Sequence, residues 1–182
     1  MSQMRSNGQA LWAFSLAVYA GPGVKGACLA LQDDFDADVN ILLLAAWAGA
    51  ARQLLLDHDD FRRILRASAD WRDHVVRPLR RVRRAVGARL DRLPEGIDPY
   101  AALKAAELAT EQTQQHMLAL ALSGLEHHSS HRNGEALAAA NMMTYMAVLG
   151  RDDSPDLSGP VAVIAGAAAG PLGAPQDKTH LE

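Results

Sequence analysis

The chain contains little of several residue types. Its 182 residues include one cysteine and only three each of Phe, Tyr and Trp. A single cysteine excludes an intrachain disulfide framework and any zinc site built on pairs of cysteines. β-Branched residues are also sparse, whereas alanine and leucine dominate, and this bias favours helices over strands. No glycine-rich phosphate loop and no nucleophile elbow occurs, so the sequence points to no catalytic residue.

Basic charge is unevenly distributed along the chain. Of the 18 lysines and arginines, 11 lie between residues 62 and 92, and all 11 are arginine. This stretch has three acids and a net charge of +8, although the net charge of the chain is −3. Such a run is either an anion-binding surface or one half of an internal charge pairing. The acidic balance, and the lack of any nucleic-acid motif, argue against DNA or RNA as the partner.

Two apolar segments resemble targeting or membrane signals. Residues 11–20 end in Val18-Tyr19-Ala20, a pattern that signal peptidase accepts, but only Arg5 precedes them and the apolar run is interrupted. Residues 39–51 are apolar over a length typical of a buried helix and too short for a bilayer span. We therefore expect a cytoplasmic protein with no membrane span, and a signal peptide within residues 1–20 stays open.

The hydrophobic periodicity predicts an all-α fold, a single compact bundle of five to seven helices. Helices are expected over residues 11–20, 24–35, 39–56, 60–76, 78–90, 99–125 and 135–149. The 39–56 helix is apolar nearly all round and should be central. The predicted helical domain covers residues 10–149. Residues 150–182 are rich in Pro, Gly and Ala without periodicity, and a disordered tail is expected there.

The arginine-rich stretch should not form one straight helix. At 1.5 Å per residue it would be about 50 Å long, whereas a compact domain of this size is about 40 Å across. Pro78 should therefore separate two helices or sharply kink one. The arginines expected to grip an anionic ligand or an acidic partner are Arg72, Arg77, Arg80, Arg83 and Arg84. The alternative is that they pair with residues 33–38, Glu107 and Glu111 of the same chain.

Polar and aromatic side chains interrupt otherwise apolar helices. Because buried polar groups need partners, these side chains indicate either a cross-linked core or a lined pocket. The pocket hypothesis assigns ligand binding to Trp12, Tyr19, Asn40, Trp47, Trp71, Arg77, Arg80, Glu107 and Glu111. The direction of Arg77 and Arg80 separates the two interpretations. Guanidinium groups turned inward around a cavity favour the pocket, and groups that fan into solvent favour a binding surface.

Three further patterns suggest chemistry only weakly. Glu107 and Glu111 stand four apart, but a di-iron bundle would repeat Glu-x-x-His, and salt bridges to arginines are the favoured interpretation. Histidines at positions 127, 128 and 131 lie in a loop, where adventitious metal affinity is favoured over a built site. Cys28 lies on an apolar face and should be a buried, inert thiol. We therefore predict no catalytic residue, no metal site and no cofactor.

Several residues also carry a family resemblance. They are Trp12-x-Phe14-Ser15, Tyr19, Gly23-Val24, Cys28-Leu29-x-Leu31-Gln32, Asp38-Val39-Asn40-x-Leu42-Leu43, Trp47, Val76-x-Pro78-Leu79-Arg80 and Glu107-Leu108-x-x-Glu111. This signature resembles a small proteobacterial family catalogued as a domain of unknown function, over roughly residues 11–149. The resemblance implies an all-helical cytoplasmic bacterial protein. It implies no known activity.

The sequence supports two functional hypotheses. The leading one is a non-enzymatic helical module whose arginine-rich helix engages a protein partner or a small anionic ligand. The alternative is a small-molecule-binding or enzymatic domain with a pocket lined by Trp, Tyr, Arg and Glu. A subsidiary hypothesis is a homodimer through a seam on the 99–125 helix. The residues of that seam are Leu103, Ala106, Thr110, Thr113, Met117, Leu120 and Gly124.

Overall fold

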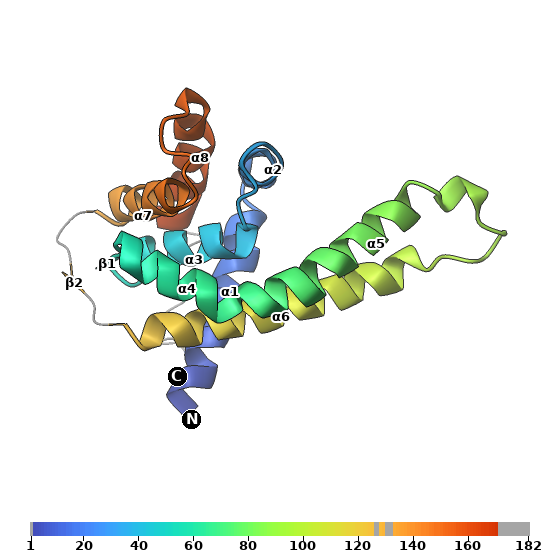
Figure 1. Cartoon of the computed structure of the whole chain (residues 1–182), viewed down its shortest axis with the longest axis horizontal. Helices are drawn as coiled ribbons and strands as arrows, with labels where there is room; N and C mark the ends of the chain where they lie inside the picture. Colours follow the sequence, from blue (N-terminus) through green and yellow to red (C-terminus); the bar gives the residue numbers. More distant parts are fainter. Residues whose placement is uncertain (1, 126–127, 130–132, 171–182) are drawn as a thin grey trace, which may run out of the picture.

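The computed structural model describes residues 2–125, 128–129 and 133–170 (Figure 1). In chain order the elements are α1 (Ser2–Tyr19), α2 (Val24–Phe35), α3 (Val39–Ala50), β1 (Leu54–Leu55), α4 (His58–Trp71), the π-helical turn η1 (Arg72–Val76), α5 (Arg77–Gly87), the 3₁₀ turn η2 (Leu90–Arg92), α6 (Tyr100–Ser123), β2 (His128–Ser129), α7 (Gly134–Val148), the 3₁₀ turn η3 (Pro155–Leu157) and α8 (Ser158–Ala169). The predicted all-α class is confirmed. Because α4, η1 and α5 follow without interruption, the described residues form seven helical runs.

The helix α3 is the centre of the bundle, as its composition predicts. Every residue from Asn40 to Gly49 is buried. The helix α7 crosses it so closely that a Cβ at Gly49 would lie 2.3 Å from the backbone nitrogen of Ala138. Only glycine fits this crossing, because any larger residue would force the two helices apart.

The central helix ends earlier than predicted, at Ala50 instead of residue 56. Gln53 adopts a left-handed backbone conformation with φ of 55°, and β1 follows as a two-residue strand antiparallel to β2. The buried Asn141 of α7 holds this turn, since its side chain accepts from the Leu56 N–H and donates to the Leu54 carbonyl. A helix continued to residue 56 would leave Asn141 without these partners.

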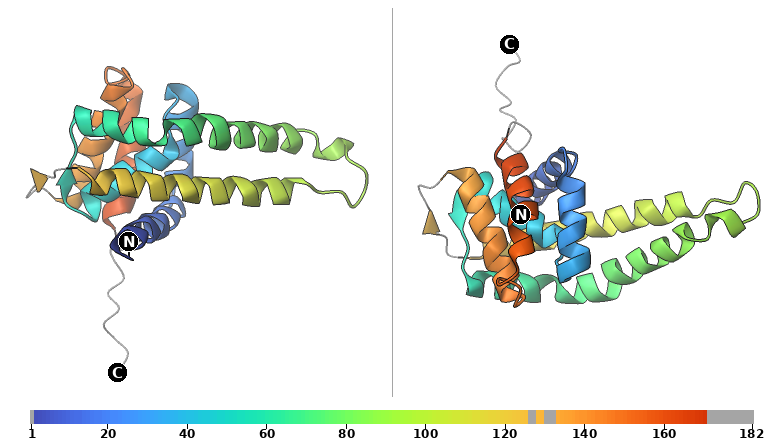
Figure 2. Two further views of the ribbon diagram at one scale, coloured as in Figure 1. Left: turned by 60° about the horizontal axis from the view of Figure 1, so that its bottom comes forward. Right: turned by 90° about the horizontal axis from the view of Figure 1, so that it is seen from above.

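The arginine-rich stretch is a continuous helical run, but the π-helical turn η1 separates α4 from α5 just before Pro78, so the expected interruption near the proline takes the form of a π-turn. Pro78 has no N–H and would clash with the carbonyl four residues earlier in a regular α-helix. The π-helical turn absorbs the proline, because the Arg77 N–H just before it donates to Arg72 five residues back. The length of the run also does not have to fit within the width of the bundle. The helices α5 and α6 extend together as a hairpin, here called the arm (residues 77–110), away from the other helices (Figures 1 and 2).

The long helix α6 lies close to its predicted bounds, but it packs on a different face. The residues that it buries are Glu107, Gln114, Gln115, Leu118, Ala119 and Leu122. None of the seven residues of the predicted seam is buried, and Leu120 is 52% exposed. The seam is therefore not an internal packing face of this chain.

Both ends of the described chain are more helical than predicted. The helix α1 begins at Ser2 instead of residue 11, since it packs along α6, where a Cβ on Gly8 would meet His116. The region expected to be a disordered tail contains α8, which buries Val161 and Ile164 against the core. The boundary at residue 150 is therefore wrong, and residues 171–182 lie outside the described part.

None of the helices described is by itself both long and apolar enough to cross a bilayer. The pair α1 and α2 reaches that length only together, and it is bent by 102° between Tyr19 and Val24.

Candidate functional site

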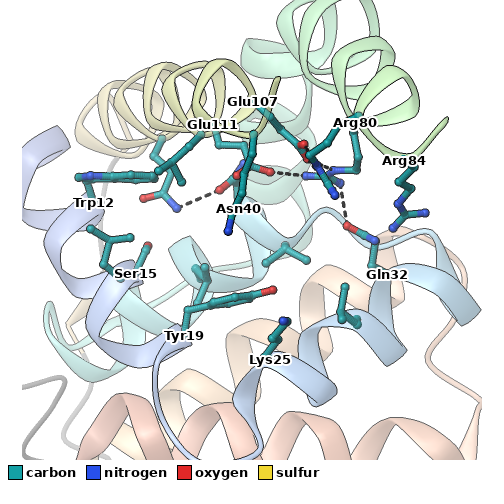
Figure 3. Close-up of a pocket in the computed structure, with 18 of the residues that line it drawn as sticks. Trp12, Ser15, Tyr19, Lys25, Gln32, Asn40, Arg80, Arg84, Glu107 and Glu111 are labelled. Atoms are coloured by element: carbon teal, nitrogen blue, oxygen red, sulfur yellow. Dashed lines mark hydrogen bonds and ion pairs between the residues drawn. The ribbon is translucent and has the colours of Figure 1, made fainter. Parts of the chain in front are cut away.

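A cavity of about 590 Å³ lies where the base of the arm meets α1, α2 and α3 (Figure 3). Its volume suits a small organic molecule. The lining residues are Trp12, Ser15, Leu16 and Tyr19 from α1; Lys25, Leu29, Gln32 and Asp33 from α2; Val39, Asn40 and Leu43 from α3; Arg80, Arg83 and Arg84 from α5; and Tyr100, Lys104, Glu107, Leu108, Glu111 and Gln115 from α6. Trp12 and Tyr19 stand on the α1 side, Lys25 on the α2 side, and Arg80 and Glu107 on the arm side.

Arg80 joins three elements across the wall of this cavity. Its Nε donates to Glu107 Oε1 at 3.0 Å, its Nη1 to Gln32 Oε1 at 2.7 Å and its Nη2 to Glu111 Oε1 at 2.5 Å. The side chain is only 18% exposed. The planar guanidinium presents its donors in a fixed fork, so each partner sets the position of the others. Arg80 therefore fixes α5 against both α6 and α2 (Figure 3).

Arg83 completes this network one turn further along α5. Its guanidinium donates to both carboxylate oxygens of Glu107 and, at 3.2 Å, to the Tyr100 hydroxyl. It also lies 5.9 Å from the centre of the Tyr100 ring, within the range of a cation–π contact. Glu107, 7% exposed, thus forms ion pairs with two arginines at once.

The two glutamates of the site differ in pKa. Burial raises the pKa of Glu107, but the hydrogen bonds from Arg83 and Arg80 outweigh burial and hold the pKa below its ordinary value. For Glu111 burial dominates, and the pKa is raised in spite of the nearby Arg80. Burial, and the nearby Glu111 carboxylate, also raise the pKa of Tyr19, so its hydroxyl keeps its proton and remains a donor.

A chain of buried amides runs under the cavity. Gln115 Nε2 donates to Asn40 Oδ1 at 2.9 Å, and Asn40 Nδ2 donates to Gln114 Oε1 at 2.8 Å. Gln114 Nε2 in turn donates to Asp38 Oδ2 at 2.6 Å, and Asp38 Oδ1 caps α3 by accepting from the Asn40 N–H. The interpretation that buried polar residues find partners inside the bundle is supported at Asp38, Asn40 and Gln114.

Cations exceed acids around the cavity. Five basic side chains line it against three acidic ones. Arg80 and Arg83 are paired with glutamates, and Arg84 lies 3.5 Å from Asp33. Lys25 and Lys104 form no ion pair with any residue in the described part of the chain. The cavity therefore keeps an uncompensated positive charge.

Six of the nine residues in the pocket hypothesis line this cavity: Trp12, Tyr19, Asn40, Arg80, Glu107 and Glu111. The other three lie elsewhere. Trp47 is buried in the core beneath Arg52, and Trp71 donates its indole N–H to the Thr110 carbonyl. Arg77 pairs with Asp36 at 2.9 Å and, with Arg72, borders a second hollow of about 330 Å³. Arg72 itself pairs with the adjacent Asp73.

Several residues of the site escaped the sequence analysis, although their helical spacing could have indicated them. Ser15 lies three residues after Trp12 and four before Tyr19, and Gln115 lies four after Glu111. Lys104 is three before Glu107 on the same face of α6. Lys25 and Tyr100 offered no such signal, because each stands alone at the beginning of its helix.

Other groups with chemical potential do not join this cavity. Cys28 is fully buried, and burial raises the pKa of its thiol to about 12, which leaves little reactive thiolate. Among the described residues, no three His, Cys, Asp or Glu side chains are placed to hold a metal ion. The proposed histidine group at positions 127, 128 and 131 has no described side chains.

The fold and the cavity together define a helical bundle with an internally cross-linked, positively charged pocket. The chain belongs to the family described as protein of unknown function (DUF2390), whose model matches residues 10–118. That range contains every residue that lines the cavity. No curated protein and no solved structure matches the chain.

Proposed function

We propose that this protein binds a small organic anion with an aromatic or other apolar body in the cavity between the arm and helices α1 to α3. The observation that carries the proposal is the pair Lys25 and Lys104, which line the cavity without an ion-pair partner among the described residues. Trp12, Tyr19 and Tyr100 supply aromatic surface in the same cavity.

The paired charges support a binding pocket over a simple cross-link. Arg80 and Arg83 are already neutralised by Glu107 and Glu111, so these four side chains form a rigid wall. An anion can then bind Lys25 and Lys104 without the cost of breaking an existing ion pair. The protonated Tyr19 hydroxyl adds a hydrogen-bond donor.

Isothermal titration calorimetry with indole-3-acetate, 4-hydroxybenzoate and their neutral methyl esters tests this proposal. The carboxylates should bind more tightly than the esters. The double variant Lys25→Gln/Lys104→Gln should weaken the carboxylates roughly tenfold, because exposed charges each contribute about 1 kcal/mol or less. Arg89→Gln removes an exposed arm charge outside the cavity and is the matched control. No binding by either carboxylate, or equal binding of acids and esters, would contradict the proposal.

A second candidate function is docking of an acidic protein on the arm. Arg81 and Arg89 are exposed and form no ion pair with described residues, and each is followed in the sequence by an exposed apolar residue, Val82 (48%) and Leu90 (41%). This candidate predicts salt-sensitive retention on immobilised polyglutamate that Arg81→Gln/Arg89→Gln abolishes. Retention unchanged in that variant would exclude it.

The homodimer through α6 stays a prediction. Leu120 of the predicted seam is exposed, as is Leu108 (47%) on the same helix. Size-exclusion chromatography with light scattering at micromolar concentration distinguishes the dimer from a monomer. A clean monomer would remove the hypothesis.

A further inference from the structure

Two buried polar atoms in the wall of the cavity have no partner among the described residues. The hydroxyl of Ser15 and the Oε1 carbonyl of Gln115 are shielded from solvent and make no hydrogen bond within the described part of the chain. The two residues are 3% and 1% exposed, and both line the cavity. Buried polar groups in native proteins are nearly always paired, so these two atoms call for a partner that enters the cavity.

The buried amide chain determines which atom of Gln115 is left over. The Asp38 carboxylate only accepts hydrogen bonds, so Gln114 must turn its NH₂ group toward it. The Gln114 carbonyl then accepts from Asn40, and the Asn40 carbonyl accepts from Gln115. Each amide is thereby oriented by the one before it. Gln115 is left with its carbonyl oxygen unpaired.

We propose that the cavity selects ligands that carry an N–H or O–H group, which Gln115 Oε1 accepts, and that Asp38 fixes this selectivity through Gln114 and Asn40. The inference rests on the proposed function, since the same ligand places its anionic group at Lys25 and Lys104. Ser15 can donate or accept, so its hydroxyl adapts to either kind of group. Gln115 is therefore the discriminating residue, and Asp38 is a positioning residue that does not touch the ligand.

Matched probes that differ in one donor test the inference by calorimetry. Indole-3-acetate and benzofuran-3-acetate have the same shape, but the ring N–H of the first is an ether oxygen in the second. Likewise, 4-hydroxybenzoate has an O–H where 4-fluorobenzoate has fluorine. The wild-type protein should prefer the donor of each pair roughly tenfold or more, because a buried acceptor facing the other probe stays unpaired.

Two variants separate donor recognition from a merely structural role. In Gln115→Met the acceptor is gone, and the preference should fall to within about threefold. In Asp38→Asn the side chain still caps α3, since Asn is as good an N-cap as Asp, but its amide can donate as well as accept. The amide chain can then reverse and present the Gln115 NH₂ group. The variant should therefore keep its affinity for carboxylates and lose the discrimination between donor and acceptor probes.

The outcomes distinguish this inference from the function on which it rests. Binding of both members of each pair with equal affinity overturns donor recognition and leaves the proposed function standing. A preference for benzofuran-3-acetate, or a donor preference that survives in Gln115→Met, also overturns it. Failure of all four carboxylates to bind overturns both. A donor preference lost in both variants, each with the circular dichroism of the wild type, supports it.

Discussion

Replacing Arg80 with methionine should destabilise the protein by about 3 kcal/mol. Removing one member of a buried, hydrogen-bonded ion pair typically costs about 3–5 kcal/mol, because the remaining charge is left without compensation. We take the lower end for two reasons. Arg80 retains 18% exposure beside the cavity, and Glu107 keeps its second partner Arg83. Urea denaturation followed by circular dichroism measures the free energy of unfolding directly.

The two acids beside Arg80 should respond differently to its removal. Glu111 forms no ion pair other than that with Arg80 in the described part of the chain, and its pKa is already raised by burial. Neutralising it in Arg80→Met/Glu111→Gln should therefore recover about 1–2 kcal/mol. Neutralising Glu107 in Arg80→Met/Glu107→Gln should recover less, because Arg83 then loses its own partner.

The exposed neighbour Arg81 provides the control for this series. Arg81→Met makes the same substitution at an exposed residue that forms no ion pair in the described part of the chain, and it should change the free energy of unfolding by less than about 0.5 kcal/mol. An Arg80→Met variant as stable as Arg81→Met would refute the argument that the guanidinium holds the arm to the bundle. Equal recovery in the two double variants would refute the distinction between Glu107 and Glu111.

Two further predictions concern pH and packing. The pKa of Glu107 is lowered on folding, so its ionisation stabilises the protein above the unfolded value of 4.5, and this contribution is lost as pH falls toward the folded pKa. The stability gap between wild type and Glu107→Gln, measured by urea denaturation, should be constant at pH 6–7 and narrow below pH 4.5; a constant gap to pH 3 would contradict the pairing. Gly49→Ala should lower the free energy of unfolding by about 3 kcal/mol, because its Cβ would overlap Ala138. In Gly26→Ala the Cβ meets nothing within 4 Å, so this variant should leave the free energy of unfolding unchanged.

Local patterns predicted most of the helices because their signals lie within a few residues. Asp is a favoured N-cap residue, and Asp38 and Asp57 both accept from the backbone of the helix that follows. The end of α3 was not predictable in this way. It depends on Asn141, whose side chain accepts a hydrogen bond from the Leu56 N–H, 85 residues away in the sequence. A local pattern of a few residues cannot contain both partners.

The disorder expected after residue 150 shows how composition can mislead. The segment that forms α8 is rich in alanine and glycine, and its four buried residues, including Val161 and Ile164, follow helical spacing. A short helix of small residues has little periodic contrast of its own, and it is stabilised by packing on α2 and α7.

The candidate pocket was partly predictable because buried polar residues must find partners. That argument alone indicated Asn40, Glu107 and Glu111 as members of one site. It failed for Trp47 and Trp71, because a tryptophan in an apolar helix can equally well be buried in the core. Its indole N–H then needs only one acceptor, as Trp71 finds in the Thr110 carbonyl. Periodicity does not distinguish these environments.

The contact of α5 with α6 is one that hydrophobic periodicity does not reveal. Val82 and Leu90 of α5 are exposed, whereas Arg80 and Arg83 turn toward α6. In the arm, α5 packs mainly on α6, and its links to α2 and to the residue after α2 are the polar contacts of Arg80 with Gln32, Arg84 with Asp33 and Arg77 with Asp36. The contact between α5 and α6 is held by hydrogen-bonded charged groups. Apolar periodicity, which identifies the buried face of a helix inside a bundle, therefore does not identify the face of α5 that contacts α6.

Arginine and lysine differ in their roles at this site: the arginines form ion pairs within the chain, and the lysines are proposed to bind the ligand. Six of the eleven clustered arginines form ion pairs with acids among the described residues. A guanidinium fork suits such fixed geometry, whereas an ammonium group on a flexible stem adapts to an entering ion. The two cations of the cavity wall that remain unpaired there are Lys25 and Lys104. On the proposed function, the arginines therefore build the wall of the pocket, and Lys25 on α2 and Lys104 on α6 provide its affinity for an anion. The high net charge of the arginine run draws attention away from these two lysines in the sequence.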